Sequence, residues 1–397
     1  MAAYRTLDDL HERDVKGKRV LVRADLNVPM RDGKIADALR IERQAPTIID
    51  LADKGARVIV LSHFDRPGGR VVPSMSLKPV ARALASFIGR PVGFAPDCIG
   101  EKAVAAVAAM NDGDVLVLEN TRFHPEEEKN EIAFAKAMAA LGDFYVNDAF
   151  SAAHRAHAST EAIACLLPAY AGRSMQAELE HLHRALDNPE RPLMAVVGGA
   201  KVSTKIDLLN NLAAKVDVLV IAGAMANTFL AAQDYQIGKS LAELDLRDVA
   251  RQIITDSVML PKDVVVAETL QPNAPCRIAA ISDVTPHEMI LDVGPRTIQA
   301  FAKRLRTVKT LVWNGPFGAF EVPPFDRGTN AAAKAVAELT REGKLLSVAG
   351  GGDTVAALVH AGVMEDFTYV STAGGAFLEW LEGRTLPGVA ALGAKLH

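Results

Sequence analysis

The chain has 397 residues, which is enough for two domains that each bury a core. Its net charge of −4 argues against a nucleic-acid or membrane-surface protein with an overall basic field. No apolar run reaches the roughly 18 residues of a membrane helix. The three cysteines, Cys98, Cys165 and Cys276, have no CxxC spacing. They suit a reduced cytoplasm and are interpreted as small core residues. We expect a cytoplasmic protein without nucleic-acid or membrane partners, and a monomer by default.

Short apolar runs alternate with amphipathic helical stretches along the whole chain. This alternation indicates an α/β fold with parallel sheets. In the first half we expect strands at 19–23, 58–62, 115–118 and 144–146, with helices such as 77–88 and 131–141 between them. In the second half we expect strands at 193–197, 218–222, 264–267, 310–313, 345–349 and 369–371.

The segment between the halves predicts a helix that joins two domains. Its apolar residues repeat at helical spacing: Met175, Leu179, Leu182 and Leu186. Ser174 is the expected N-cap, and Pro189 stops the helix. The expected boundaries are 1–172 for the first lobe, 173–188 for the connecting helix and 189–383 for the second lobe. A long helix inside one domain is the alternative.

Each predicted strand of the first half is followed by a basic or hydrogen-bonding side chain. Ligands bind beyond the carboxyl ends of parallel strands, so these side chains are expected to converge at one edge. Guanidinium groups bind phosphate and carboxylate in a bidentate manner, which predicts a small, multiply anionic ligand. The candidates are Arg23, Asp25, Asn27, His63, Arg66, Arg122, His154 and Arg155, with Arg40 from a following helical stretch.

The corresponding turns of the second half are rich in glycine. Backbone amides and helix N-termini favour phosphate, so this edge predicts a nucleotide site. The glycines Gly350–Gly352 interrupt a strand-to-helix pattern, and Asp353 suits an outer ligand of Mg²⁺ on a nucleotide. An ordinary N-cap role for Asp353 stays open. Other residues of these turns are Gly198, Gly199, Lys201, Lys205, Gly223, Gly315, Gly318, Glu321, Gly374 and Gly375.

Several familiar motifs do not occur in the sequence. There is no GxGxxG, and Gln233 stands where a Walker A loop ending at Ser240 would need its first glycine. HExxH and Cys/His metal spacings are also missing. We interpret His154 and His157 as structural, and Glu126–Glu128 as a solvated loop.

Specific motifs in one fixed order resemble the phosphoglycerate kinase family over residues 18–392. These are residues 23–29, 118–123, 148–157, 198–205, 312–316 and 350–354. The resemblance implies reversible phosphoryl transfer in glycolysis, between 1,3-bisphosphoglycerate with ADP and 3-phosphoglycerate with ATP, in the presence of Mg²⁺. It also implies two Rossmann-like lobes with parallel sheets, joined by a helix, with a C-terminal return of residues 384–397 to the N-terminal lobe.

The resemblance further assigns residues to sites. The 3-phosphoglycerate site would consist of Asp25, Asn27, Arg40, His63, Arg66, Arg122 and Arg155. For the nucleotide, the matching residues are Lys201, Lys205, Glu321 at the ribose, the phosphate loop Gly351, Gly352 and Thr354, and Asp353 on the Mg²⁺ side. The catalytic roles would fall to Arg40, Lys205, Gly374 and Gly375.

Two positions depart from the family pattern. Phe64 and Asp65 stand where the family commonly has leucine and glycine, and an added carboxylate weakens anion binding unless it points away. Ala373 replaces a common glycine, which tightens that turn.

The expected chemistry needs positioning and charge stabilisation, and no general base, because a carboxylate acceptor is already ionised at neutral pH. Arg40 and Lys205 would offset the charge of the transferring group. The alternatives are a non-catalytic nucleotide- and sugar-phosphate-binding protein, and a dehydrogenase of the same general architecture.

Overall fold

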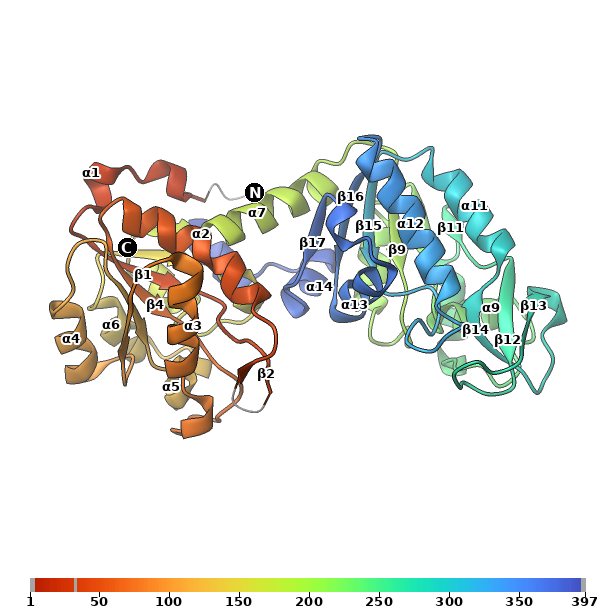
Figure 1. Cartoon of the computed structure of the whole chain (residues 1–397). Helices are drawn as coiled ribbons and strands as arrows, with labels where there is room; N and C mark the ends of the chain where they lie inside the picture. Colours follow the sequence, from red (N-terminus) through yellow and green to blue (C-terminus); the bar gives the residue numbers. More distant parts are fainter. Residues whose placement is uncertain (1–3, 32–33, 394–397) are drawn as a thin grey trace. The chain divides into compact units, whose positions relative to one another are not determined.

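The computed structural model describes residues 4–31 and 34–393, which form two compact units (Figure 1). Unit 1 extends to Leu179 and takes up the chain again from Thr385, whereas unit 2 spans Glu180–Arg384. Each unit contains one six-stranded parallel sheet. The predicted α/β class with two parallel-sheet lobes is therefore confirmed.

The sheet of unit 1 has the strand order β5-β6-β4-β1-β7-β8, and every neighbouring pair is parallel. Its central strands are short apolar runs that are buried on both faces, as helices on both sides require. In sheet order, the strands are β5 (Val92–Ala95), β6 (Val115–Leu118), β4 (Arg57–Leu61), β1 (Arg19–Arg23), β7 (Phe144–Asn147) and β8 (Ala169–Ala171).

Helices cover both faces of this sheet because the connections run to one side of β1 as far as β5 and then return past it to β7 and β8 (Figure 1). α2 (Leu39–Asp53) and α3 (Lys78–Ile88) pack on the face that contains Val20, Val58 and Val117. The other helices of unit 1 are α1 (Glu12–Val15), α4 (Gly100–Ala108), α5 (Pro125–Glu128), α6 (Ile132–Ala139) and α15 (Pro387–Ala390). A short hairpin is formed by β2 (Met30–Arg31) and β3 (Lys34–Ile35).

The C-terminal segment returns to unit 1, as the resemblance implies. The backbone N–H of Gly388 donates to the carbonyl of Ala153 at 2.9 Å, and the amide of Asn147 donates to the carbonyl of Gly388 at 3.4 Å. Leu392 is buried there. Residues 394–397 of the predicted return lie outside the described residues.

The sheet of unit 2 repeats the design, with the order β11-β10-β9-β15-β16-β17. The strands are β11 (Val258–Met259), β10 (Val218–Ile221), β9 (Leu193–Val197), β15 (Thr310–Asn314), β16 (Leu346–Gly350) and β17 (Tyr369–Ser371). The helices are α8 (Ile206–Ala213), α9 (Met225–Ala232), α10 (Arg247–Ile253), α11 (Pro295–Leu305), α12 (Arg327–Arg341), α13 (Gly352–Ala361) and α14 (Gly375–Leu381). Trp313 and Phe317 centre the core beneath α11 and α12.

One predicted strand of unit 2 belongs to a different sheet. β12 (Asp263–Ala267) pairs in antiparallel fashion with β13 (Cys276–Ala280) and β14 (Met289–Val293). The apolar residues of β12 could not reveal whether it pairs in parallel or antiparallel fashion, because this depends on how the strands are connected. Cys276 is exposed on β13, so its expected core role is wrong, whereas Cys98 is buried.

The helix predicted between the halves is α7 (Arg173–Leu182), which continues as a π-helical turn, His183–Asp187. The predicted cap at Ser174 is wrong. The carboxylate of Asp148 accepts the N–H groups of Ser174 at 2.8 Å and Met175 at 3.1 Å, while the Ser174 hydroxyl donates to the carbonyl of Arg43. A tertiary contact supplies the cap, so the local sequence could not reveal it.

Within residues 4–31 and 34–393, every helix is too short or too polar to span a bilayer.

Replacing Asp148 with asparagine is expected to keep the cap and remove a pH dependence. Burial raises the pKa of this carboxyl from 3.8 to about 7, so the folded chain holds a proton that the unfolded chain has released. The free energy of unfolding of the wild type should therefore fall, relative to Asp148→Asn, as the pH rises from about 4 to about 7. Urea unfolding of both proteins across this range measures the difference.

Asp148→Ala is the matched control, because it loses the oxygen that accepts the N–H groups of Ser174 and Met175, and it should cost about 1–2 kcal/mol. A constant difference between the wild type and Asp148→Asn over the range would contradict this account.

Candidate functional site

The carboxyl ends of four strands form one edge of the unit 1 sheet. The register pairs Arg23 at the end of β1 with Leu61 of β4 and with Asn147 of β7. The chain leaves β1 toward β4, while β7 lies on its other side, and such a reversal is where open parallel sheets leave a ligand crevice. At this edge, Asp25 and Asn27 follow β1, His63 and Arg66 follow β4, Arg122 follows β6, and Arg155 follows β7.

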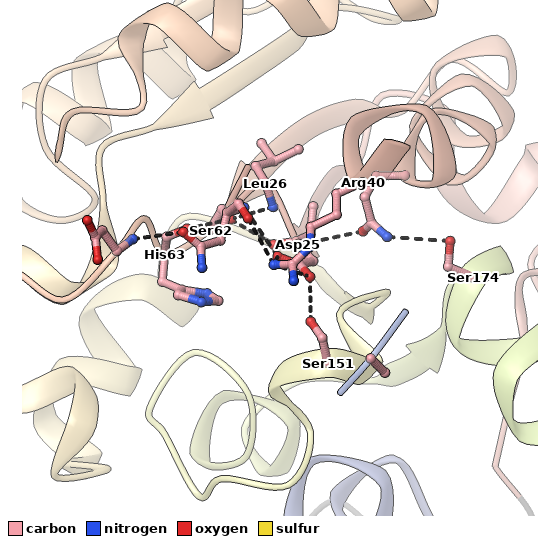
Figure 2. Close-up of polar contacts among 12 residues, drawn as sticks. Asp25, Leu26, Arg40, Ser62, His63, Ser151 and Ser174 are labelled. Atoms are coloured by element: carbon pink, nitrogen blue, oxygen red, sulfur yellow. Dashed lines mark hydrogen bonds and ion pairs between the residues drawn. The ribbon is translucent and has the colours of Figure 1, made fainter. Parts of the chain in front are cut away.

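Asp25 and Arg40 lie at the centre of the polar contacts of this edge (Figure 2). Nη1 of Arg40, on α2, lies 3.3 Å from Oδ2 of Asp25 and donates to the carbonyl of Asn27 at 2.8 Å. Ser151, which follows β7, donates to Oδ2 of Asp25 at 2.5 Å. The Asp25 carboxylate is thus held from both sides of the crevice, and Arg40 stays half-buried at its rim.

Gln44, one turn after Arg40 on α2, connects this edge to the start of α7. Its Oε1 accepts the backbone N–H of Asp25 at 3.1 Å. Its amide nitrogen donates to the carbonyl of Asp148 at 3.2 Å and lies 3.4 Å from Oγ of Ser174. One buried side chain therefore links the Asp25 backbone to the first turn of α7.

Arg23 is fully buried and contacts neutral acceptors. It donates to Oγ of Ser159 at 2.8 Å, to the carbonyl of Ala24 at 2.7 Å and to Nδ1 of His63 at 2.9 Å. Arginine remains charged in proteins, so Nδ1 of His63 must be the acceptor. The imidazole is then neutral and presents Nε2–H as its donor.

Burial holds the pKa of His63 well below 6.5, and the charges of Arg23, Arg122 and Arg40 act in the same direction. His157 is affected similarly, with a pKa lowered to about 4 by burial and then by Arg122, Arg23 and Arg155. The guanidinium groups that follow different strands therefore act on the same two imidazoles. The structure brings Arg40, Arg122 and Arg155 together with His63 and His157 at one positive edge.

Arg122 is nearly buried in the 3₁₀ turn Thr121–Phe123. Its Nη1 donates to the carbonyl of Asp65 at 2.9 Å, and its Nε lies 3.2 Å from the half-exposed carboxylate of Glu128. Burial and the charge of Arg23 lower the pKa of Arg122. By contrast, Arg66 is exposed, and its place in the site stays a prediction.

Glu127 corrects the expectation of a solvated acidic loop, because its carboxylate is fully buried. The hydroxyl and N–H of Ser159 donate to it at 2.5 and 3.0 Å, and the Thr121 hydroxyl does so at 3.3 Å. Burial raises the pKa of Glu127, while Arg23 opposes the rise. Since Ser159 also accepts from Arg23, one hydroxyl joins the buried guanidinium to the buried carboxylate.

The departure at Phe64 and Asp65 does not place a free carboxylate at the edge. Phe64 is buried in the unit 1 core. Asp65 has φ +54°, a backbone conformation that favours glycine, and its Oδ1 accepts the N–H of Arg66 at 2.9 Å. The N–H of Asp65 donates to Oδ1 of Asn27 at 2.9 Å. The added carboxylate thus caps its own turn, as aspartate in left-handed turns often does.

In unit 2, the glycine turns after β9, β10 and β15 pack backbone against backbone. A Cβ at Gly198 would lie 2.1 Å from the carbonyl oxygen of Pro316, and one at Gly223 would lie 2.6 Å from the nitrogen of Gly199. Gly223 also has φ +67°. No side chain fits between these turns, so their amides gather at one edge of the sheet.

Lys205 projects its ammonium group into these turns. It donates to the carbonyl of Gly198 at 2.5 Å and to Oδ1 of Asn314 at 2.7 Å. Burial lowers the pKa of Lys205 from 10.5 to about 8, and Asp353 opposes the shift. The neutral acceptors hold the cation without cancelling its charge. Lys201, on the same loop, is exposed.

The turn after β16 opens α13 with Gly351 at φ +99°. The hydroxyl of Thr354 accepts the N–H of Gly315 at 2.7 Å, which ties this turn to the one after β15. Asp353 is exposed in the first turn of α13, near enough to Lys205 to affect its pKa. One exposed carboxylate fits Mg²⁺ that also coordinates nucleotide phosphates, because Mg²⁺ commonly takes one or two protein carboxylates.

A cavity of about 400 Å³ adjoins these turns within unit 2. Its lining includes Gly199, Leu241, Phe317, Glu321 and Asp353. Apolar walls with a few polar groups at one end suit a nucleoside whose phosphates reach the glycine turns.

The predicted glycine turn after β17 begins α14. Gly374 has φ +56°, which favours glycine, and Gly375 is exposed. The N–H of Ala373 donates to the hydroxyl of Ser371 at 3.2 Å. Alanine therefore takes part in an ordinary serine-stabilised turn at this position.

Several residues of the two edges did not appear among the predicted site residues. Asn314 stands directly beyond the predicted strand 310–313, and Ser151 lies in the loop that follows 144–146, so the strand-end rule could have found both. Arg23 was predicted to lie at this edge, but its full burial could not be predicted because it depends on tertiary packing. Gln44 gave no signal in the sequence.

The chain is similar to known proteins over nearly its whole length. A family model described as phosphoglycerate kinase matches residues 7–384. The phosphoglycerate kinase of Mesorhizobium japonicum is 62% identical over 98% of this chain and 99% of that protein. The phosphoglycerate kinase of Granulibacter bethesdensis is 60% identical over 99% of this chain and 100% of that protein.

Solved structures agree with these matches. The structure of phosphoglycerate kinase from Coxiella burnetii is 45% identical, with a TM-score of 0.91, and covers 98% of this chain and 99% of that one. The crystal structure of the enzyme from Pyrococcus horikoshii is 30% identical, with a TM-score of 0.81 and coverage of 98% on both sides.

His63 is expected to stay neutral with its proton on Nε2, because Arg23 occupies Nδ1 and burial disfavours the imidazolium. Nitrogen chemical shifts of labelled histidine should show this tautomer, with no titration at the ordinary pKa of 6.5. The exposed His287 serves as the internal reference for the histidine signals. A His63 signal that titrates near 6.5, or that shows the Nδ1–H tautomer, would refute the assignment.

Proposed function

The chain belongs to the phosphoglycerate kinase family, and we propose that its unit 1 binds the phosphoglycerate while its unit 2 binds the nucleotide. The chain catalyses reversible phosphoryl transfer in glycolysis, between 1,3-bisphosphoglycerate with ADP and 3-phosphoglycerate with ATP. Each unit would contribute its own set of side chains to this reaction.

One observation carries the assignment of 3-phosphoglycerate to unit 1. Among the described residues, the direct contacts of the buried Arg23 are a hydroxyl, a carbonyl and an imidazole, and Arg23 lies with Arg40 and Arg122 around a neutral His63. A ligand with a phosphate and a carboxylate would add negative charge to this edge beyond that of Asp25, Glu127 and Glu128. His63 would donate through Nε2, while Arg66 and Arg155 would close the site from the strand ends. Asp25 and Asn27 would position Arg40 and orient the hydroxyl of the substrate.

The nucleotide assignment rests on the glycine turns and the cavity of unit 2. The base and ribose would occupy the cavity, with Glu321 at the ribose hydroxyls. Gly351, Gly352 and Thr354 would contact phosphate through the start of α13, with Lys201 and Lys205 as counter-charges. Asp353 would hold Mg²⁺, which supplies charge neutralisation on the phosphates.

The residues of the chain would then act by charge stabilisation. The acceptor carboxylate is ionised at neutral pH, so no side chain needs to remove a proton. Arg40 and Lys205 would stabilise the charge on the transferring group, with the amides of Gly374 and Gly375 near it. Transfer requires the acceptor oxygen and the terminal phosphate to meet in line.

The proposed setting is a cytoplasmic monomer that acts on small molecules, without nucleic-acid or membrane partners. The mixed surface charge of the chain supports this proposal. A coupled assay with ATP, Mg²⁺ and 3-phosphoglycerate tests the function directly. The assay also distinguishes the kinase from a non-catalytic binding protein, which would bind both ligands without turnover. It likewise distinguishes the kinase from a dehydrogenase, which would need a nicotinamide cofactor.

Arg40→Ala is expected to lower kcat by at least about tenfold, equivalent to roughly 1.4 kcal/mol of transition-state stabilisation. The physical reason is the loss of a guanidinium group from the rim where the phosphoryl group would arrive. Arg82→Ala, at an exposed arginine on α3, is the matched control and should leave turnover unchanged. Steady-state kinetics of both variants decide, and a smaller loss in Arg40→Ala would remove this residue from the catalytic role.

Nucleotide affinity is expected to weaken above about pH 8, where Lys205 loses its proton in the free protein. A lysine with a lowered pKa offers its full charge only below that pKa, so affinity should fall by up to about tenfold per pH unit above it. Isothermal titration with ADP from pH 7 to 9.5 measures the effect. Lys205→Met should bind ADP more weakly than the wild type, and its affinity should change little with pH. Lys201→Met should keep the decrease in affinity above about pH 8. An equal slope in Lys205→Met would show that another group is responsible.

A further inference from the structure

Two loops of unit 1 bring together three side chains that can ligate a metal. Asp97 and Cys98 follow β5, and His124 ends the 3₁₀ turn Thr121–Phe123 after β6. A carboxylate oxygen, the sulfur and a ring nitrogen of these residues all lie within 4.8 Å of one another. Within residues 4–31 and 34–393, no other group of three or more such side chains meets this geometry.

We propose that Asp97, Cys98 and His124 form a binding site for Zn²⁺ or a divalent cation of similar chemistry, separate in its ligands from the phosphoryl-transfer site. Thiolate, imidazole and carboxylate together are donors that Zn²⁺ takes in tetrahedral sites, with a fourth position left for water. A thiolate ligand selects against Mg²⁺, which prefers oxygen donors.

The ligands are held in place before any ion arrives. Oδ1 of Asp97 accepts the N–H of Cys98 at 2.7 Å and lies 2.8 Å from Nε2 of His124. The imidazole packs against Phe134, with ring centroids 5.1 Å apart. Such outer contacts fix the orientation of metal ligands and so strengthen binding. An ion would take the place of the hydrogen bond between Asp97 and His124, and the imidazole would bind it through Nε2 with its proton on Nδ1.

The charges around the sulfur favour a cation. Cys98 is fully buried, while Asp97 and His124 keep 39% and 27% of their side chains exposed, which gives an ion access from solvent. The carboxylates of Asp97, Glu127 and Glu119 lie near enough to the sulfur to act on it electrostatically. Binding forms one metal–sulfur bond while the thiol proton leaves to solvent.

The metal site would stabilise the fold of unit 1 and would take no part in phosphoryl transfer. His124 directly follows the turn that holds Arg122, and Asp97 and Cys98 belong to the loop after the edge strand β5. A bound ion would tie this loop to that turn and stabilise unit 1 by mass action, in proportion to its affinity. The inference does not depend on which residues transfer the phosphoryl group.

Co²⁺ is the probe for the first experiment, because a cobalt–thiolate bond gives charge-transfer absorption in the near ultraviolet. The parent should be the Cys276→Ser protein, since Cys276 is exposed and would bind metal on its own. We expect one equivalent of Co²⁺ to produce the band, Zn²⁺ to abolish it by displacement, and excess Mg²⁺ to leave it unchanged. No cobalt–thiolate band in the parent would overturn the proposal.

Variants assign the ligands. Cys98→Ser should lose the band, while Cys165→Ser, at the remaining cysteine, should keep it. Asp97→Asn retains an oxygen that can accept the N–H of Cys98, and it should still weaken Co²⁺ binding at least about tenfold, as should His124→Gln. A band that survives Cys98→Ser or disappears with Cys165→Ser would place the metal elsewhere.

Thermal unfolding keeps the test decisive if the buried Cys98→Ser variant fails to fold. Zn²⁺ should raise the unfolding midpoint of the parent and leave that of His124→Gln unchanged. Equal shifts in both proteins would refute the site, because His124 would then contribute nothing to the binding. The coupled assay on the parent with and without Zn²⁺ serves separately to check that turnover does not require the ion.

Discussion

Buried cations that are held directly by neutral acceptors are the constraint on which both edges depend. Arg23 donates to a hydroxyl, a carbonyl and an imidazole, and Lys205 donates to a carbonyl and a side-chain amide. Neutral acceptors satisfy the hydrogen-bonding groups but leave the charge of each cation in place, and low dielectric strengthens its field. Glu127, behind the Ser159 hydroxyl, and Asp353 offset part of this electrostatic cost, and an anionic ligand would offset more of it. The parallel sheets, the glycine turns and the second ring of side chains serve to hold these cations in position.

Much of this arrangement could be predicted from the sequence because it follows local rules. Period and composition identified most strands of both parallel sheets but missed β5, β8 and β11, which are edge strands. The rule that ligands bind beyond strand ends selected Asp25, His63, Arg122 and Lys205. The glycine turns were recognisable because close backbone approach excludes every other residue, as the space at Gly198 shows. Charged residues at strand ends and glycines at tight turns can both be recognised from a few neighbouring residues.

What could not be predicted depends on partners that are distant along the chain. The carboxylate of Asp148 caps a helix that begins 25 residues later at Arg173. Glu127 is buried where Ser159, from a turn after β7, and Arg23, at the end of β1, approach it. An acidic run such as Glu126–Glu128 looks solvated unless that packing is known. In the same way, Asp97 and His124 come together only through the pairing of β5 with β6. Such contacts are products of topology, which short-range patterns do not encode.

The ion pair between Arg40 and Asp25 has a consequence for selectivity. In the free protein this guanidinium already has an anionic neighbour 3.3 Å away, and it is also held by the Asn27 carbonyl. With Arg40 in the proposed ligand site, an incoming anion would compete with the Asp25 carboxylate, so a chloride ion would gain little there. A molecule with several negative charges would engage the other cations first and then replace Asp25 at Arg40. The pair would thus disfavour the binding of solutes that carry little charge.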